Sequence, residues 1–394
     1  MTIKFKKNVN ANFIKQLRCH YRSNDLHNFL GPLLFQVEIT NTCNSRCQMC
    51  KRWRWSTYKK SGSDLTTSEL KNLFTEVKKM GTKIVVLSGG EPTLRKDFTE
   101  LIDHLTTLGL EAAPYTNGTN LNKAIIKSLV KNNANVCFSV DGVTKETHDK
   151  IRGVPGMFDK VIKSIKELNK SRKEKPSNKT KIRINFVLQK DNVKDLAHLS
   201  GLAKKLGVDE VRIEAIHEEP RLNVLKSDYP LIKKFLKNFK NDKRLDITPF
   251  IDMLVKGKLG KDYDGRGLRV KNLFLDYPVP CFKCYMYSLV DAHGFVFPCM
   301  YLYYDTRGDA FDAKRRQYRM GNIHKEKFSK IWNNVKYAEF RKKTNPVNLR
   351  SYPACANCEL YSDFKNTYQQ LMKKTNSSSR ANEFLAFLNV VRHH

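Results

Sequence analysis

The sequence predicts an α/β fold in which a parallel sheet is followed by a small cysteine-rich C-terminal extension. Short apolar segments alternate with amphipathic segments from Leu33 to about Ile216. This alternation is typical of strands joined by right-handed helical crossovers, which make the strands parallel. A second observation is a set of five cysteines beyond residue 280, and a third is the length of 394 residues, which favours two domains.

Six apolar segments are predicted to be strands: Leu33–Ile39, Lys83–Leu87, Glu111–Tyr115, Asn135–Val140, Lys181–Leu188 and Glu210–Ala215. Amphipathic segments between them are predicted to be helices: Ser68–Met80, Asp97–Leu108, Ala124–Asn132, Phe158–Leu168 and Val193–Leu206. Six such units are too few to close an ordinary eight-stranded barrel.

The regions around this α/β part are expected to be shorter and largely helical. Between the α/β part and the cysteines, helices are predicted over Lys226–Lys240 and Ile247–Lys258. The expected division is a lead-in over residues 1–32, the α/β region over 33–220, a helical bridge over 221–279, the cysteine-rich region over 280–362 and a helical tail over 363–394. No apolar run is long enough to indicate a membrane span, and the N-terminus lacks the apolar segment of a signal peptide.

The composition is strongly basic, with 72 Lys and Arg against 39 Asp and Glu and a net charge of +33. Such an excess attracts anions, including nucleic acid. The lysines are dispersed over the whole chain, however, and no RNA-binding motif accompanies them. Because most of the ten cysteines stand in metal-type spacings and no export signal precedes them, we expect metal binding in a reducing cytoplasm.

The segment from Val37 to Trp53 carries Cys43, Cys47 and Cys50 in the spacing Cys-x3-Cys-x2-Cys. Thiolates this close on one loop can converge on an iron–sulfur cluster or a zinc ion. Three ligands leave a coordination position open, where a metal can bind a reactant. The loop follows a predicted strand, and α/β proteins place their chemistry at the carboxyl ends of strands. A structural zinc loop is the alternative.

Polar residues and glycines follow the next strands of the predicted sheet. After the second strand, consecutive glycines in Ser88-Gly89-Gly90-Glu91-Pro92 let a backbone approach a ligand closely, and the carboxylate can accept hydrogen bonds from an ammonium group. Arg152 offers a fork of donors that suits a carboxylate. The same residue types also occur in plain turns, as at Thr116-Asn117-Gly118 and Ser139-Val140-Asp141-Gly142.

The C-terminal cysteines are predicted to come together around a small hairpin. Ser288–Asp291 and Phe295–Pro298 flank a His293-Gly294 turn, and this hairpin brings Cys281 close to Cys299. The turn Cys355-x2-Cys358 can complete a site with four thiolates. By spacing alone, a zinc ribbon and an iron–sulfur cluster are both compatible with this set.

The cysteine triplet together with the strand-end motifs resembles the signature of radical S-adenosylmethionine (SAM) enzymes. The resemblance implies a partial (β/α)6 TIM-like barrel whose open side admits substrate. It also implies that Cys43, Cys47 and Cys50 hold a 4Fe–4S cluster whose open iron binds SAM. The cofactor-binding residues that it implies are Met49, Gly89, Gly90, Glu91, Asn117, Ser139 and Arg152, with Asp141 as a weaker candidate.

The C-terminal region resembles the SPASM extension of the same superfamily, through Cys281, Gly294 with Cys299, the segment from Gly321 to Trp332, and the Cys355-x2-Cys358 pair. That extension carries auxiliary 4Fe–4S clusters. Since the full set of seven cysteines is not present, the resemblance implies one auxiliary cluster. Its expected ligands are Cys281, Cys299, Cys355 and Cys358, and the role of Cys284 is left open.

The resemblance implies a reaction in which a flavodoxin, a ferredoxin or a reductase supplies one electron. Reductive cleavage of SAM then yields a 5′-deoxyadenosyl radical, which abstracts hydrogen from a peptide or protein side chain or from a sugar-like small molecule. The auxiliary cluster is expected to assist an oxidation, either a dehydrogenation or the formation of a new bond. An RNA-modifying radical SAM enzyme and a non-enzymatic zinc-binding interaction protein are the alternatives. No catalytic acid or base is assigned from the sequence.

Overall fold

The computed structural model describes residues 31–50, 52–54, 64–175, 177–215, 222, 224–238, 244–247, 283–304 and 316–344. The lead-in up to residue 30, the predicted helix beyond residue 247, the helical tail, and Cys281, Cys355 and Cys358 lie outside these residues. In the described part of the chain, no helix is both long and apolar enough to cross a membrane.

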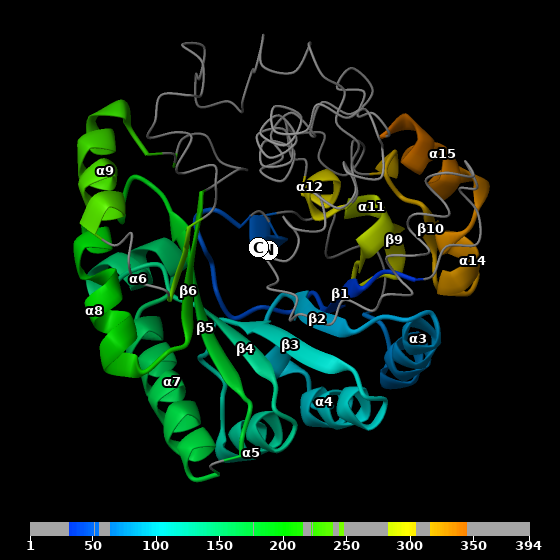
Figure 1. Ribbon diagram of the computed structural model, residues 1–394, viewed down its shortest axis with the longest axis horizontal. Helices are drawn as coiled ribbons and strands as arrows, with labels where there is room; N and C mark the ends of the chain where they lie inside the picture. The colour runs from blue at the N-terminus through cyan, green and yellow to red at the C-terminus, as the bar shows by residue number, and fades with distance from the viewer. Residues whose placement is uncertain are drawn as a thin grey trace, which may run out of the picture.

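The predicted parallel sheet is confirmed, and Figure 1 shows it curving so that its helices lie on the outer side. Its central strands run in chain order, each parallel to the next: β1 (Leu34–Thr40), β2 (Ile84–Gly89), β3 (Glu111–Thr116), β4 (Asn135–Ser139), β5 (Lys181–Leu188) and β6 (Glu210–Ala215). The curvature with an open side agrees with a partial TIM-like barrel.

A strand beyond β6 was not expected. The residues Leu245–Ile247 form β7, which pairs in parallel with Val211–Ile213 of β6. The prediction of a helix beginning at Ile247 is therefore wrong at that residue, because the exposed edge of β6 offers backbone partners that a sequence pattern does not reveal. The preceding helix of the bridge is present as α9 (Tyr229–Asn238).

The helices pack apolar faces against the sheet, and their ends are set by local signals. For α3 (Thr67–Lys79), Thr66 and Glu69 form a capping box, and the buried residues Leu70, Leu73, Phe74 and Val77 follow the helical period. The other helices of the barrel are α4 (Phe98–Thr107), α5 (Lys123–Lys131), α6 (Lys145–Arg152), α7 (Met157–Lys173) and α8 (Leu196–Leu206).

The C-terminal part continues the same sheet. The predicted hairpin is present as β8 (Tyr287–Val290) and β9 (Phe295–Phe297), with Gly294 in the left-handed region at φ 80°. Strand β8 pairs in parallel with β1, so the cysteine-rich part lies beside the strand that leads into the cysteine loop. The remaining elements are α11 (Lys283–Met286), α12 (Met300–Tyr303), β10 (Gly321–Asn322), α14 (Phe328–Trp332) and α15 (Val335–Lys343).

Alternation along β1 separates an apolar outer face from a polar inner face. Phe35 packs its ring against Phe328 of α14, with ring centroids 5.1 Å apart, and is fully buried. The next residue, Gln36, points the other way and donates a hydrogen bond of 3.0 Å to the hydroxyl of Ser88 on β2. The inner face of the barrel is therefore lined by polar side chains, which is the condition for a binding site rather than a packed core.

Candidate active site

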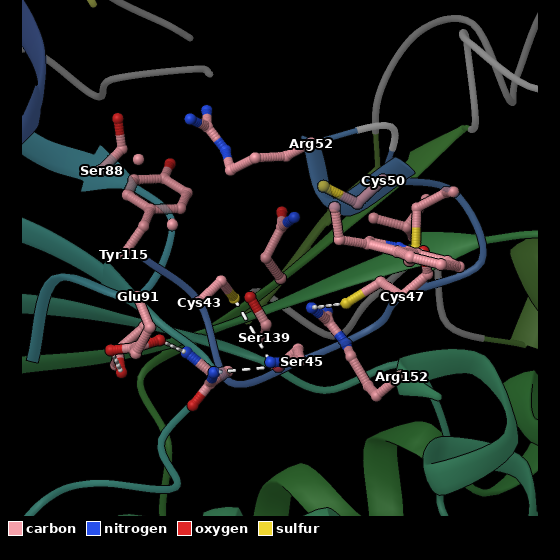
Figure 2. Close-up of a pocket in the computed structure, with 18 residues that line it drawn as sticks. Cys43, Ser45, Cys47, Cys50, Arg52, Ser88, Glu91, Tyr115, Ser139 and Arg152 are labelled. Atoms are coloured by element: carbon pink, nitrogen blue, oxygen red, sulfur yellow. Dashed lines mark hydrogen bonds between the residues drawn. The ribbon is translucent and has the colours of Figure 1, made fainter. Parts of the chain in front are cut away.

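A cavity of about 240 Å³ opens at the carboxyl ends of the central strands (Figure 2). The three thiols of the cysteine loop, residues 41–50 directly after β1, all line it. So do all seven residues that the radical SAM resemblance assigned to the cofactor: Met49, Gly89, Gly90, Glu91, Asn117, Ser139 and Arg152. The fold thus gathers residues of the loop after β1, of β2 to β5 and of α6 around one cavity.

The cysteine loop is held in place by the end of α6. The backbone N–H groups of Arg46 and Gln48 donate to the carbonyl oxygens of Arg152 and Ile151, at 2.9 and 2.8 Å. This close approach requires glycine at position 153, which has φ 72° and lies where a Cβ atom would be 2.3 Å from the carbonyl oxygen of Arg46. Helix α6 was missed by the sequence patterns because its exposed face is mostly charged and few apolar residues mark its period.

The two glycines after β2 allow the backbone of that turn to lie against the cysteine loop. The N–H of Gly90 donates to the carbonyl of Thr40 at 2.7 Å, and a Cβ atom at Gly90 would lie 2.0 Å from the carbonyl oxygen of Thr42. The close approach that the glycines permit is therefore first of all to the protein's own loop. This contact fixes the loop beside the cavity.

Glu91 is buried and accepts hydrogen bonds from several groups of the protein. Its carboxylate accepts from the hydroxyls of Thr93 and Thr116 and from the N–H of Asn117, each at 2.6 Å. Burial raises the pKa of Glu91, and these hydrogen bonds oppose the rise. Glu91 therefore joins the ends of β2 and β3, in addition to the contact with a SAM ammonium group that the resemblance implies.

Asn117 connects the end of β3 to the cysteine loop. Its amide donates to the side-chain oxygen of Asn44 at 2.7 Å and to the hydroxyl of Ser45 at 3.0 Å. The N–H of Ser45 in turn points at the sulfur of Cys43, at 3.4 Å. Asn117 thus supports the loop that carries the thiols as well as lining the cavity.

Arg152 lies beside a thiol and is held by a buried carboxylate. Its Nη1 is 3.6 Å from the sulfur of Cys47, and its Nη2 is 2.5 Å from Oδ2 of Asp141. Asp141 is fully buried and does not line the cavity, so its weaker assignment as a cofactor contact is replaced by a role in holding Arg152. Burial raises the pKa of Asp141, and the guanidinium opposes that rise.

His148 completes this arrangement behind Arg152. Burial and the charge of Arg152 lower the pKa of His148 to about 3, so its imidazole is neutral. Its Nδ1 lies 3.2 Å from the N–H of Asp141 and accepts a hydrogen bond from it. Because the imidazole is neutral, it holds the backbone of Asp141 without adding a second positive charge beside Arg152.

Replacing Asp141 with Asn should weaken SAM binding about tenfold and lower the free energy of unfolding by about 3 kcal/mol. The variant places an amide donor against the guanidinium, and breaking a buried ion pair typically costs about 3–5 kcal/mol. SAM binding by equilibrium dialysis and thermal unfolding would measure the two effects. Asp149→Asn is the control and should leave SAM affinity unchanged. Asp149 is also an acceptor on this segment, but its partners are the backbone N–H groups of Gly156 and Phe158. An unchanged SAM affinity in Asp141→Asn would contradict this role.

The residues at the cavity fit a cluster held by three thiolates. Three sulfurs line the same space, a guanidinium lies beside one of them, and a backbone N–H points at another. Among the described residues, no three Cys, His, Asp or Glu side chains converge closely enough to hold a single metal ion. Because the three thiols line one cavity without converging on one point, they suit a cluster with one thiolate on each of three irons better than a single zinc ion.

Several cavity residues were not identified from the sequence. Tyr115 stands on β3 and shares a register level with Cys137 of β4, and burial raises the pKa of both groups. Cys137 therefore faces the inside of the barrel rather than a helix. The alternation along the strands was the available signal, but it does not say which of the two faces is the inner one. The other missed residues are Ser45, Arg52, Trp53, Ser88, Thr116, Asn185 and Val187.

Of the predicted auxiliary-cluster ligands, Cys299 is described and half-buried at the N-terminal cap of α12. Cys284, whose role was left open, lies in α11 and is 1 % exposed. Its sulfur is 3.5 Å from the hydroxyl of Thr344 at the end of α15. This contact joins α11 to α15. Ligation by Cys299 stays a prediction, and the role of Cys284 stays open.

The chain matches known families over both of its cysteine-bearing regions. The family model described as the radical SAM superfamily matches residues 37–200, and the iron–sulfur cluster-binding SPASM domain matches residues 281–359. The AdoMet-dependent heme synthase of Methanosarcina barkeri is 29% identical over 339 residues, which are 84% of this chain and 89% of that protein. The tungsten-containing aldehyde ferredoxin oxidoreductase cofactor-modifying protein of Pyrococcus furiosus is 26% identical and covers 82% of this chain and 86% of its own length.

A solved structure of Streptococcus suis SuiB bound to S-adenosylmethionine has the same fold. Its TM-score is 0.60 at 17% identity, and the alignment covers 91% of this chain and 78% of that chain. Fold and site together define a protein with a partial α/β barrel and a cavity for a cluster and its ligand. The chain belongs to the radical SAM superfamily and carries a C-terminal SPASM domain. The expected fold class and the expected cofactors, 4Fe–4S clusters and SAM, are confirmed, and the zinc-binding alternative is not supported.

Proposed function

We propose that this chain is an oxidoreductase that uses SAM to remove a hydrogen atom from an unactivated carbon of a peptide or protein side chain. The observation that carries the SAM-dependent part of the proposal is the convergence of the three thiols with Gly89, Gly90, Ser139 and Arg152 on one cavity. When bound, the cluster and SAM supply the electron and the adenosyl group that takes the hydrogen atom. The auxiliary cluster of the SPASM domain would accept the electron that the substrate radical gives up as it also loses a proton.

The protein's own residues would bind, orient and shield the reactants. Arg152 and Ser139 would bind the SAM carboxylate, because a guanidinium and a hydroxyl are donors suited to it. The turn at Gly89 and Gly90 would receive the amino end, with Glu91 as the acceptor for its charge. The cavity walls would limit the access of water and hold the reacting groups in a fixed geometry, which is the contribution that such a site makes to the rate.

The substrate would enter on the side of the cavity where Ser88, Tyr115 and Arg52 lie. In Figure 2 these residues occupy the upper part of the view, whereas Ser45, Ser139 and Arg152 occupy the lower part. No hydrogen bond from the Tyr115 hydroxyl is found to any other described residue. This hydroxyl is therefore the group on that wall best placed to meet a polar atom of the substrate.

A peptide is the preferred substrate class for two reasons. SuiB, which has the same fold, is also known in a structure bound to its precursor peptide SuiA. The mycofactocin maturase MftC of Mycobacterium tuberculosis is 30% identical over 178 residues, which are 45% of this chain. A sugar-like substrate is the remaining prediction from the sequence, and the RNA-modifying alternative continues to rest on the net charge.

A precursor of heme is a second candidate substrate. Two relatives that match over most of the chain are named AdoMet-dependent heme synthases, at 84% and 83% coverage. The anaerobically reconstituted protein can be tested with SAM and dithionite against peptide fractions and against an iron porphyrin. A peptide substrate would stimulate 5′-deoxyadenosine formation and lose two mass units. A shifted Soret band with a porphyrin product would replace the peptide by the second candidate, and stimulation by neither class would refute both.

Tyr115→Phe should weaken the use of substrate without impairing SAM binding. Loss of one neutral hydrogen bond costs about 0.5–1.5 kcal/mol, so kcat/KM for the substrate should fall roughly three- to tenfold. Basal 5′-deoxyadenosine formation and the SAM dissociation constant should stay within about twofold. Tyr337→Phe is the control, because Tyr337 is buried in the C-terminal part and donates to Ser288. Equal kcat/KM values for the wild type and Tyr115→Phe would exclude a contact between this hydroxyl and the substrate.

A further inference from the structure

Glu38 is a fully buried carboxylate on the inner face of β1. A charged group in this position is stable only if partners compensate it. Its Oε1 accepts from Nη2 of Arg52 at 2.6 Å, and its Oε2 accepts from the hydroxyl of Tyr303 at 2.7 Å. The hydroxyl of Tyr304 adds a longer hydrogen bond of 3.3 Å to Oε1.

The partners of Glu38 come from the two cysteine regions of the chain. Arg52 stands two residues after Cys50 and lines the cavity. Tyr303 and Tyr304 follow Cys299 on the short helix α12 and the residue after it. One carboxylate therefore connects Arg52, just after the cysteine loop, with the segment that begins at a predicted auxiliary-cluster ligand.

A second path runs from Arg52 to the same C-terminal part. Its Nη1 donates to the side-chain oxygen of Asn41 at 2.7 Å. The amide nitrogen of Asn41 lies 3.0 Å from Nε2 of His293, which belongs to the turn between β8 and β9. Asp64 holds Asn41 by accepting from its backbone N–H and its side chain. Arg52 is thus linked to the SPASM part both through Glu38 and through Asn41.

We propose that Glu38 is a positioning residue that couples the SPASM part to the cysteine loop, so that Tyr303 and Tyr304 help to set the geometry of the SAM site. The network is buried and charge-assisted, and such hydrogen bonds are strong and directional. Loss of the tyrosine hydroxyls would let the carboxylate and Arg52 shift together. The proposal rests on the proposed function only in treating Cys299 as a ligand of the auxiliary cluster.

Glu76 provides a control that distinguishes coupling to the SAM site from simple stabilisation of the fold. It also joins the barrel to the C-terminal part, because its carboxylate on α3 accepts from the N–H groups of Phe328 and Ser329 at 3.1 and 3.0 Å. Its described contacts do not involve the cysteine loop. Removing the charge of Glu76 should therefore lower stability without changing the SAM site.

The test uses the holoprotein with Tyr303 and Tyr304 both changed to Phe, a change that deletes two hydroxyls and alters no group that lines the cavity. We expect SAM to bind about tenfold more weakly, which corresponds to about 1.4 kcal/mol. The change that SAM causes in the EPR spectrum of the reduced cluster should also be altered. Glu38→Gln should give a larger effect of the same kind, and Glu76→Gln should leave both readouts at wild-type values. Iron content and far-ultraviolet circular dichroism would establish that each variant is folded.

Two results would overturn the proposal. SAM affinity and EPR spectra at wild-type values in the double Phe variant would show that the tyrosines do not act on the SAM site, whatever Glu38→Gln does. Equal weakening in the double Phe variant and in Glu76→Gln would show a general effect on the fold. The single Tyr303→Phe variant decides the question if the double variant does not fold. Failure of the proposed function would appear separately, as absence of substrate-dependent hydrogen transfer in the wild type.

Discussion

Replacing Cys43, Cys47 and Cys50 together with Ala is expected to abolish SAM cleavage while leaving about four irons per chain. The three thiols line the cavity and are the expected ligands of the SAM-binding cluster, so their loss removes the electron source at the site. The remaining iron would belong to the C-terminal cysteines. Iron and sulfide analysis, together with detection of 5′-deoxyadenosine by mass spectrometry, would measure the result.

Cys137→Ala is a matched control for this triple variant. Cys137 is a buried thiol on the inner face of β4 and is not among the expected ligands, so its loss should leave the iron content and SAM cleavage unchanged. Cleavage retained by the triple variant would refute the assignment of the SAM-binding cluster. Complete loss of iron, in a variant with unchanged circular dichroism, would instead refute an auxiliary cluster.

Replacing Cys355 and Cys358 with Ala is expected to separate SAM cleavage from product formation. Cleavage needs the cysteine loop, SAM and a reductant, so 5′-deoxyadenosine should still form if the barrel stays folded. The substrate radical could no longer pass its electron to the auxiliary cluster, and finished product should fall roughly 10- to 100-fold, the loss typical when groups that support a metal site are removed. Product and 5′-deoxyadenosine would be quantified in the same anaerobic reaction.

The folded state of this variant must be verified before its activity is read. A cluster cross-links the segments that hold it, and its loss can cost folding energy directly. Iron content near that of one cluster and unchanged circular dichroism would show that the barrel is intact. Cys284→Ala should be measured beside this variant, because Cys284 packs against Thr344 and its role as a cluster ligand is open. Its iron content would show whether this thiol holds the cluster. Wild-type product formation by the folded Cys355 and Cys358 variant would make the auxiliary cluster structural and would remove the main support for the oxidoreductase proposal.

The central strands and the cysteine spacing could be predicted because their signals are local. The alternation of apolar and amphipathic segments places each of the six central strands within a residue or two of its observed position. Gly89 and Gly90 were placed at the site because strand ends of a parallel sheet meet at one edge, whereas Arg152 was placed there only by the family resemblance of its segment. Helix α6 was missed, since its sequence Lys145–Arg152 is polar and its ends at Thr144 and Gly153 are the main signals.

Asp141 shows where local reasoning gave the right region and the wrong role. A residue at a strand end is expected to face the cavity, but this carboxylate is fully buried, does not line the cavity and pairs with Arg152. Glu91 likewise accepts hydrogen bonds from Thr93, Thr116 and Asn117, a role that the motif alone does not indicate. In both cases the decisive partners come from a different element of the fold.

The sequence by itself determined the α/β class, the three thiols of the cysteine loop and the superfamily, because residues a few positions apart on one segment carry these features. Only the tertiary structure decided that β8 pairs with β1 and that Glu38 meets Tyr303, which is 265 positions away in the chain. Contacts over such separations depend on how the whole sheet curves and on which face of each strand turns inward. The side chains of a strand alternate between the two faces of the sheet. The sequence of the strand therefore does not show which face turns inward or which strands pair with it.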